Sequence, residues 1–95
     1  MDTCLPAGRV HLKIIMYFVY IIQSQNDKRL YKGVTKNIEQ RLREHNIGKT
    51  KSTRPYKPWS LVYIEEFDNF DAARKRELYF KSGSGREFLK KQLDP

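Results

Sequence analysis

Tyr17-Phe18-Val19-Tyr20-Ile21-Ile22 is the stretch that decides how this chain folds. Every residue in it is aromatic or β-branched, which is typical of a buried β-strand. A turn signal follows at Asn26-Asp27, and residues 29–34 have the composition of a second strand. Two such runs joined by a short polar turn predict an antiparallel hairpin.

The rest of the chain predicts a third strand and three helices. Asn37 has the character of a helix N-cap, with a glutamine at the N3 position. Residues 59–67 form the third strand, and Asn69 caps a second helix. Ser84, with a glutamate three residues later, opens a final helix. The order β-β-α-β-α-α predicts an α+β fold in which a three-stranded antiparallel sheet is flanked by helices.

The length of 95 residues corresponds to a single domain. Residues 1–15 have no sustained hydrophobic period, so we expect a peripheral extension there and a folded domain over residues 16–93. Cys4 is the only cysteine, which excludes an intrachain disulfide and favours the reducing cytoplasm. No apolar run has the length of a membrane span, and no obligate protein partner is evident.

Positive charge dominates the composition, with a formal net charge of +8 and a sequence pI of about 9.7. Residues 28–57 alone carry ten Lys and Arg against two Glu. Residues 59–73 are acidic, and residues 74–91 are basic again. This composition favours a polyanionic partner such as nucleic acid.

A basic loop over residues 46–58 is the first candidate for contact with a nucleic-acid backbone. The hydroxyls of Thr50, Ser52 and Thr53 and the aromatic Tyr56 alternate with its cations, which suits phosphate contacts and base stacking. The alternative is a solvated loop without a partner. The candidate cations are Lys49, Lys51, Arg54 and Lys57 of the loop, together with Lys32 on the predicted second strand.

Glu77 is a carboxylate inside an apolar helix stripe. At about 100° per residue it falls on the same side of the predicted second helix as Ala73 and Phe80. A buried carboxylate needs a cation, a metal ion or a proton. An ion pair with Lys81 or Arg74 is the simpler alternative to a metal site.

The first helix repeats this pattern with Arg41 and His45, which border the face that packs on the sheet. An arginine there suits phosphate binding because its planar fork donates two hydrogen bonds and keeps its charge. Tyr20 and Tyr31 lie on adjacent strands and can face the same groove. Tyrosines in strands are usually packing residues, and a phenol needs a nearby cation, such as Arg41, Lys32 or a metal ion, to act as a base.

Taken together, these motifs resemble the GIY-YIG nuclease superfamily, and in particular small stand-alone bacterial UvrC-like endonuclease-domain proteins. The resemblance covers about residues 16–93. It is carried by Tyr17-Phe18-Val19-Tyr20-Ile21-Ile22, Leu30-Tyr31-Lys32-Gly33-Val34-Thr35, Arg41-Leu42-Arg43-Glu44-His45-Asn46 and Arg76-Glu77. Phe18 and Lys32 stand where the family motifs have glycine and isoleucine, and the chain has no asparagine after Asn69 to match the one that some family nucleases use.

The resemblance implies metal-dependent hydrolysis of phosphodiester bonds in nucleic acid, with DNA as the expected substrate. Tyr20 and Tyr31 match the motif tyrosines, one of which is the base for water. Arg41 matches the arginine that stabilises the phosphate. Glu77 matches the single ligand of one Mg²⁺ or Mn²⁺ ion. His45 matches a polar position near the site.

Two other readings of the same residues stay open at this point. One is a nucleic-acid-binding module with weak or absent turnover, which the charge pattern supports equally well. The other is a structural or protein-binding domain in which Glu77 has a packing role only. Glu77, Arg41 and the tyrosine pair favour the endonuclease.

Overall fold

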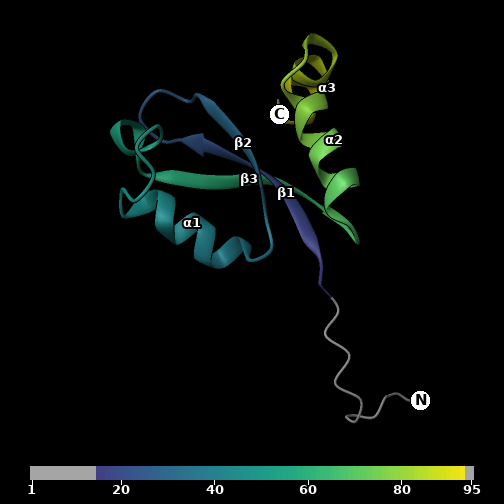
Figure 1. Cartoon of the computed structure of the whole chain (residues 1–95). Coiled ribbons are helices and arrows are strands. Elements are labelled where there is room, and N and C mark those ends of the chain that lie inside the picture. Colours follow the sequence, from purple (N-terminus) through teal and green to yellow (C-terminus); the bar gives the residue numbers. More distant parts are fainter. Residues whose placement is uncertain (1–14, 94–95) are drawn as a thin grey trace, which may run out of the picture.

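The computed structural model describes residues 15–93, so the predicted extension lies outside the described residues except for Ile15. The described chain has the order β-β-α-β-α-α, which confirms the predicted fold class. A 3-10 helix in the loop before the third strand was not predicted. The elements, labelled in Figure 1, are β1 (Tyr17–Ser24), β2 (Leu30–Thr35), α1 (Ile38–Asn46), η2 (Arg54–Tyr56), β3 (Trp59–Phe67), α2 (Phe70–Phe80) and α3 (Gly83–Leu93).

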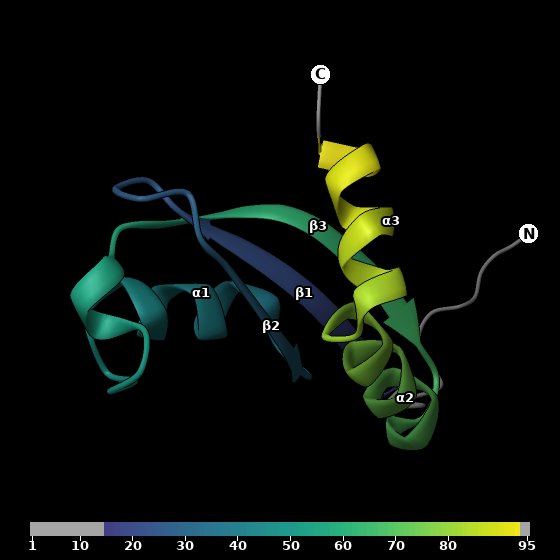
Figure 2. The same ribbon diagram turned by 90° about the horizontal axis from the view of Figure 1, so that it is seen from above.

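The three strands form one antiparallel sheet in the order β2-β1-β3. The apolar first strand is therefore the central one, with neighbours along both edges. Figures 1 and 2 show α1 on one side of the strongly twisted sheet and the α2–α3 pair on the other. Because both faces of β1 are covered, four consecutive residues, Val19, Tyr20, Ile21 and Ile22, are all buried.

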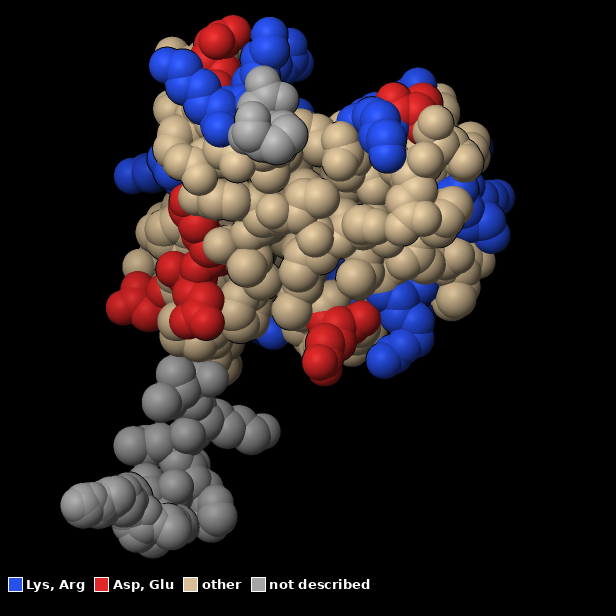
Figure 3. Space-filling model, turned by 180° about the vertical axis from the view of Figure 1, so that it is seen from behind, with Lys and Arg blue, Asp and Glu red and all other residues tan. Residues whose placement is uncertain are grey.

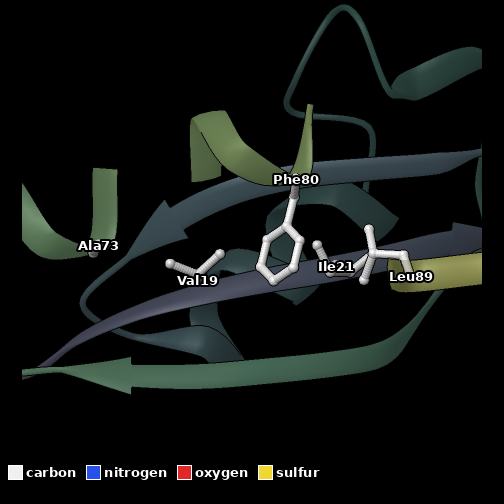
Figure 4. Close-up of a cluster of buried hydrophobic side chains, with 5 residues drawn as sticks. All are labelled: Val19, Ile21, Ala73, Phe80 and Leu89. Carbon is white, nitrogen blue, oxygen red and sulfur yellow. The ribbon is translucent and has the colours of Figure 1, made fainter. Parts of the chain in front are cut away.

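One hydrophobic core lies between the sheet and the α2–α3 pair (Figure 4). Val19 and Ile21 of β1 meet Ala73 and Phe80 of α2 and Leu89 of α3, and each of the five side chains is fully buried. Full burial of a side chain as large as Phe80 contributes about 1.5–3 kcal/mol. This core fixes the position of α2 against the sheet.

A second, smaller core occupies the opposite face, between β1, the first residue of β3 and α1. Tyr20, Ile22 and Trp59 are its buried members, and Ile38 and Leu42 of α1 pack against them. Because side chains alternate along β1, Tyr20 belongs to this core, whereas its neighbours Val19 and Ile21 belong to the other one.

Side chains that cap the first turns explain where the helices begin. The side chains of Asn37 and Asn69 accept hydrogen bonds from the backbone N–H of Gln40 and Ala72, as predicted for N-caps. The third helix begins earlier than predicted. The hydroxyl of Ser82, not Ser84, accepts the N–H of Gly85 at 3.2 Å, because the chain turns directly after α2.

Among the described residues, no helix combines the length and the apolar character that crossing a membrane requires.

Candidate active site

Two tyrosines and a histidine form an aromatic group on the α1 face of the sheet. In the β1–β2 register Tyr20 is opposite Gly33 and Tyr31 is opposite Ile22, so both tyrosines lie on the same face. Their ring centroids are 6.3 Å apart, and the ring of His45 lies 5.0 Å from that of Tyr31. The structure thus brings together three residues from three different elements.

The hydroxyl of Tyr20 is held from two directions. His45 Nε2 lies 3.0 Å from Tyr20 Oη, and Arg41 Nε donates a hydrogen bond to the same oxygen at 3.3 Å. Arg41 and His45 are one helical turn apart on α1, which is why both side chains reach one point above the sheet. The side chain of Tyr20 is 1% exposed.

Gly33 makes room for this arrangement. A Cβ atom placed on Gly33 would lie 2.5 Å from Tyr20 Oη and 2.6 Å from Tyr20 Cζ, closer than real contacts allow. The ring of Tyr20 therefore crosses directly over the backbone of β2. No residue with a side chain at position 33 leaves the phenol in this place.

Burial raises the pKa of Tyr20. The hydrogen bond and the charge of Arg41 act in the opposite direction, while Tyr31 and Glu77 add to the rise. The net direction keeps the phenol protonated near neutral pH. His45 Nε2 is the neighbouring group that can accept a hydrogen bond from this phenol.

Arg41 is positioned to meet an anion as well as to hold Tyr20. Its Nη1 donates to Glu44 Oε1 at 2.9 Å, and its side chain is 31% exposed. Burial alone would lower the pKa of Arg41, but the hydrogen bonds to Tyr20 and Glu44 raise it on balance, so the guanidinium stays charged. A hollow of about 300 Å³ opens beside it, lined by Thr35, Lys36, Asn37, Gln40, Arg41 and Glu44.

His45 is fully buried, and both ring nitrogens have partners. Besides Tyr20, Thr53 Oγ1 is hydrogen-bonded to His45 Nδ1 at 2.8 Å. Burial and, to a lesser degree, the charge of Arg41 lower the pKa of His45 to about 4, with Glu44 opposing. The imidazole is therefore neutral at physiological pH.

Thr53 was interpreted from the sequence as a surface donor for phosphates, and that interpretation is wrong. Its side chain is 1% exposed and lies against His45. Trp59 Nε1 donates to the carbonyl oxygen of Thr53 at 2.9 Å, which ties the loop to the start of β3. The sequence offers no signal for this contact, because loop residues reach the core only through the tertiary fold.

Glu77 is buried, as the helical spacing predicted, with 7% exposure. Its Oε1 accepts a hydrogen bond from Arg74 at 2.6 Å, and its Oε2 lies 3.1 Å from Lys81 Nζ. Both ion pairs named as alternatives from the sequence are therefore present together. Glu77 belongs to α2 and not to the α1 group, but its charge still contributes to the raised pKa of Tyr20.

Lys32 lies on the other face of β2 from the two tyrosines. It is opposite Ile21 in the register, on the face of the sheet that the α2–α3 pair covers. Burial and the positive charges of Arg86 and Lys81 lower the pKa of Lys32. Of the cations considered from the sequence, Arg41 is thus the one that contacts Tyr20.

The basic loop extends from the end of α1, so its cations begin one turn beyond His45. Lys49 Nζ lies 3.7 Å from Glu44 Oε2, and Arg54 Nε donates to the carbonyl oxygen of Gly48 at 2.7 Å. Lys51 and Lys57 are exposed. These contacts leave the loop's positive charge on the surface.

Comparison with known proteins identifies the family. Residues 16–91 match the family described as the GIY-YIG catalytic domain. The chain belongs to this family. A UPF0213 protein from Syntrophus aciditrophicus is 45% identical over 74 residues, which cover 76% of this chain and 84% of the relative. One from Clostridium perfringens is 45% identical, with 70% and 71% covered.

A solved relative has the same fold. The solution NMR structure of a UPF0213 protein from Bacillus halodurans matches with a TM-score of 0.50 and 30% identity, and the match covers 81% of this chain and 84% of that one. GIY-YIG domains form a nuclease family. The resemblance to the GIY-YIG family inferred from the sequence is therefore confirmed, and the relatives are UPF0213 proteins.

GIY-YIG nucleases generally use a divalent metal ion, and Glu77 is the carboxylate that the sequence pattern singled out for one. Residues 15–93 contain no group of three or more His, Cys, Asp and Glu that could hold an ion by themselves. A single carboxylate is nevertheless enough for Mg²⁺, which keeps several waters and takes further oxygens from a substrate phosphate. The carboxylate would have to exchange at least one of its two cationic partners for the ion.

Proposed function

We propose that this GIY-YIG protein is a metal-dependent endonuclease that hydrolyses phosphodiester bonds in nucleic acid, with DNA as the favoured substrate. The observation that carries the proposal is the phenol of Tyr20, which is held between the guanidinium of Arg41 and the neutral ring of His45. A proton acceptor, a fixed positive charge and a proton sink at one point are the groups that phosphodiester hydrolysis needs.

Arg41 serves the phosphate in this proposal. Negative charge accumulates on the phosphoryl oxygens as water attacks, and a guanidinium already fixed by Tyr20 and Glu44 meets that charge without reorganising. The hollow beside Arg41 gives a phosphate access to its exposed part.

Tyr20 is the proposed proton acceptor for the attacking water, and Tyr31 lines the same face. The hydroxyl of Tyr20 passes its own proton to His45 while it receives one from water, so no free phenolate has to exist beforehand. The raised pKa of Tyr20 and the lowered pKa of His45 both oppose a resting phenolate–imidazolium pair, so the two proton transfers have to occur together. Of the two tyrosines, Tyr20 has the hydrogen bonds that such a transfer uses.

Glu77 is the proposed ligand of one Mg²⁺ or Mn²⁺ ion. When bound, the ion supplies Lewis-acid stabilisation of the phosphate and of the leaving oxygen. A bound ion would replace Arg74 or Lys81 at one of the two carboxylate oxygens. Lys49, Lys51, Arg54 and Lys57, with Lys32 on the other face of β2, are proposed to contact the nucleic-acid backbone.

Cleavage assays with single-site variants test this proposal. Labelled duplex, flap and single-stranded DNA, with matching RNA, would be incubated with the purified protein and Mg²⁺ or Mn²⁺. We expect Tyr20→Phe, Arg41→Ala and Glu77→Gln each to lower kcat roughly 100-fold or more. Tyr79→Phe and Glu87→Gln, which alter the same residue types on α2 and α3 outside the site, are expected to cleave normally. Full activity in Glu77→Gln would refute the role of Glu77.

A nucleic-acid-binding module without turnover is the second candidate, and the two ion pairs of Glu77 favour it. A carboxylate satisfied by Arg74 and Lys81 has less need of a metal ion. This candidate predicts salt-dependent binding, no cleavage with any metal and no thermal stabilisation by Mg²⁺ or Mn²⁺. Stabilisation by either ion that is lost in Glu77→Gln would count against it.

A further inference from the structure

Thr53 Oγ1 lies at the end of a chain of hydrogen bonds that begins at Tyr20. His45 Nε2 is 3.0 Å from Tyr20 Oη, and His45 Nδ1 is 2.8 Å from Thr53 Oγ1. Both His45 and Thr53 are buried, with exposures of 0% and 1%. Water therefore does not compete for either ring nitrogen.

The hydroxyl hydrogen of Thr53 has a partner of its own. Thr53 Oγ1 donates to the carbonyl oxygen of Thr50 at 3.4 Å, within the turn that precedes η2. A hydroxyl has one hydrogen and two lone pairs. When this bond is made, Thr53 Oγ1 presents a lone pair to His45, and this arrangement favours the hydrogen on Nδ1.

A neutral imidazole carries its hydrogen on one nitrogen only. With Nδ1 protonated, Nε2 has a free lone pair, and that lone pair faces the hydroxyl of Tyr20. The groups that surround the ring are consistent with the neutral form. They are Tyr20 of β1, Tyr31 of β2, and Arg41 and Glu44 of α1.

We propose that Thr53 is a positioning residue that fixes the tautomer of His45, so that Nε2 is the acceptor for the proton of Tyr20. This inference rests on the proposed function only for its consequence in catalysis, because the tautomer itself follows from the contacts. Trp59 Nε1 donates a hydrogen bond to the backbone carbonyl oxygen of Thr53 at 2.9 Å. This contact fixes the backbone that carries the Thr53 hydroxyl.

In the proposed step, the bond between phosphorus and the leaving oxygen breaks as water attacks, and the leaving oxygen takes a proton from solvent. An O–H bond of the attacking water breaks as its oxygen bonds to phosphorus, and the proton goes to Tyr20 Oη. The original Oη–H bond breaks as its proton goes to His45 Nε2. The resulting imidazolium keeps its second hydrogen on Nδ1, where Thr53 Oγ1 accepts it. In the other tautomer, Nε2 would already carry a hydrogen and the transfer would be blocked.

Nitrogen NMR of the imidazole tests the tautomer directly. The wild-type protein, labelled with ¹⁵N, and the variants Thr53→Val and Thr53→Ser would be compared near pH 7, with His45→Gln to separate the signals of His45 from those of His11. We expect Nδ1–H in the wild type and in Thr53→Ser, which keeps the hydroxyl. In Thr53→Val, which has nearly the same shape, we expect a mixture of tautomers or a change to Nε2–H.

Cleavage by the same variants tests the consequence. We expect Thr53→Val to lower kcat roughly 10- to 100-fold with little change in KM, and Thr53→Ser to restore most of it. Nε2–H in the wild type, or an unchanged tautomer in Thr53→Val, would overturn the positioning role. A changed tautomer with an unchanged kcat would overturn its part in proton transfer. If the wild type cleaves nothing, the proposed function fails, but the NMR result still decides whether Thr53 sets the tautomer.

Discussion

Tyr20 and Gly33 are the pair on which the site depends at the scale of single residues. The ring of Tyr20 crosses the backbone of Gly33, and two hydrogen bonds fix the hydroxyl group of Tyr20. Neither residue has a special conformation by itself. Their relationship exists only across the β1–β2 register.

Gly33→Ala is therefore expected to displace Tyr20. The added methyl group would overlap Tyr20 Oη and Cζ, and the buried ring has little space into which to move. We expect a loss of about 1–3 kcal/mol in the free energy of unfolding and a strong loss of any cleavage activity. Urea denaturation measures the first effect. An unchanged midpoint would show that the ring has more freedom than these contacts indicate.

His45 gives the protein a pH-dependent stability. The pKa of His45 is about 4 in the folded protein and near 6.5 in an unfolded chain. Between these values the unfolded state binds the extra proton, so stability falls as pH is lowered. We expect a loss of about 1–3 kcal/mol between pH 7 and pH 4.

The variant His45→Gln supplies the control for this prediction, since it keeps every carboxylate that titrates at lower pH. Urea unfolding of both proteins at several pH values would give, for each protein, the slope of the free energy of unfolding against pH. Equal slopes above pH 4.5 would contradict the assignment of a neutral, buried imidazole.

At the scale of elements, the close approach of α3 to the end of α2 fixes one side of the larger core. Gly85 is buried, and a Cβ atom there would overlap the carbonyl oxygen of Tyr79 and the backbone of Phe80. Gly83, two residues earlier, has open space around its Cα. Of these two glycines, only Gly85 lies where a side chain would collide with backbone atoms.

Gly85→Ala and Gly83→Ala form a matched pair of variants. We expect Gly85→Ala to cost at least about 2 kcal/mol, because backbone atoms cannot move aside as a side chain can. Gly83→Ala is expected to be neutral or slightly stabilising, because alanine favours a helix over glycine by up to about 1 kcal/mol. Thermal unfolding of the two proteins compares them, and equal melting temperatures would be evidence against the tight α2–α3 contact.

At the scale of the whole molecule, charge is distributed unevenly. Seen from behind, acidic side chains gather on the side where α2 lies, and Lys and Arg occupy the rim around a broad uncharged area (Figure 3). Some of the positive charge on α2 is neutralised, since Arg76 pairs with Glu65 of β3 at 2.9 Å. The exposed cations of the basic loop are therefore the better candidates for the nucleic-acid backbone.

The salt dependence of binding measures this difference. For duplex DNA the logarithm of affinity falls by about 0.9 per unit of log salt for each phosphate neutralised. We expect Lys51→Gln combined with Lys57→Gln to reduce the slope by roughly 1.8. Lys75→Gln combined with Lys91→Gln removes the same charge from α2 and α3 and is expected to change the slope less. Equal changes in the two double variants would mean that the loop has no special role.

The local patterns of the sequence were sufficient to predict the elements and their order. The aromatic and β-branched residues of β1 favour a buried strand, and Asn37 and Asn69 satisfy helix N–H groups from their own side chains. The helical period also placed Glu77 in the buried stripe and His45 on the sheet side of α1. These features depend on neighbours within a few residues, so the sequence alone determined them.

The partners of these side chains were decided by the tertiary structure. Thr53 reaches His45 because Asn46 bonds both backbone groups of Trp59, the first residue of β3, and so closes the loop between them. Lys32 lies apart from the tyrosines because adjacent residues of a strand point to opposite faces. Tyr20 has two hydrogen bonds because α1 packs over its face of the sheet, whereas the two cations of Glu77 are local neighbours on α2. Hydrogen bonds and charges act over a few ångströms in space, and only the packed sheet brings residues that are distant in the chain within that range.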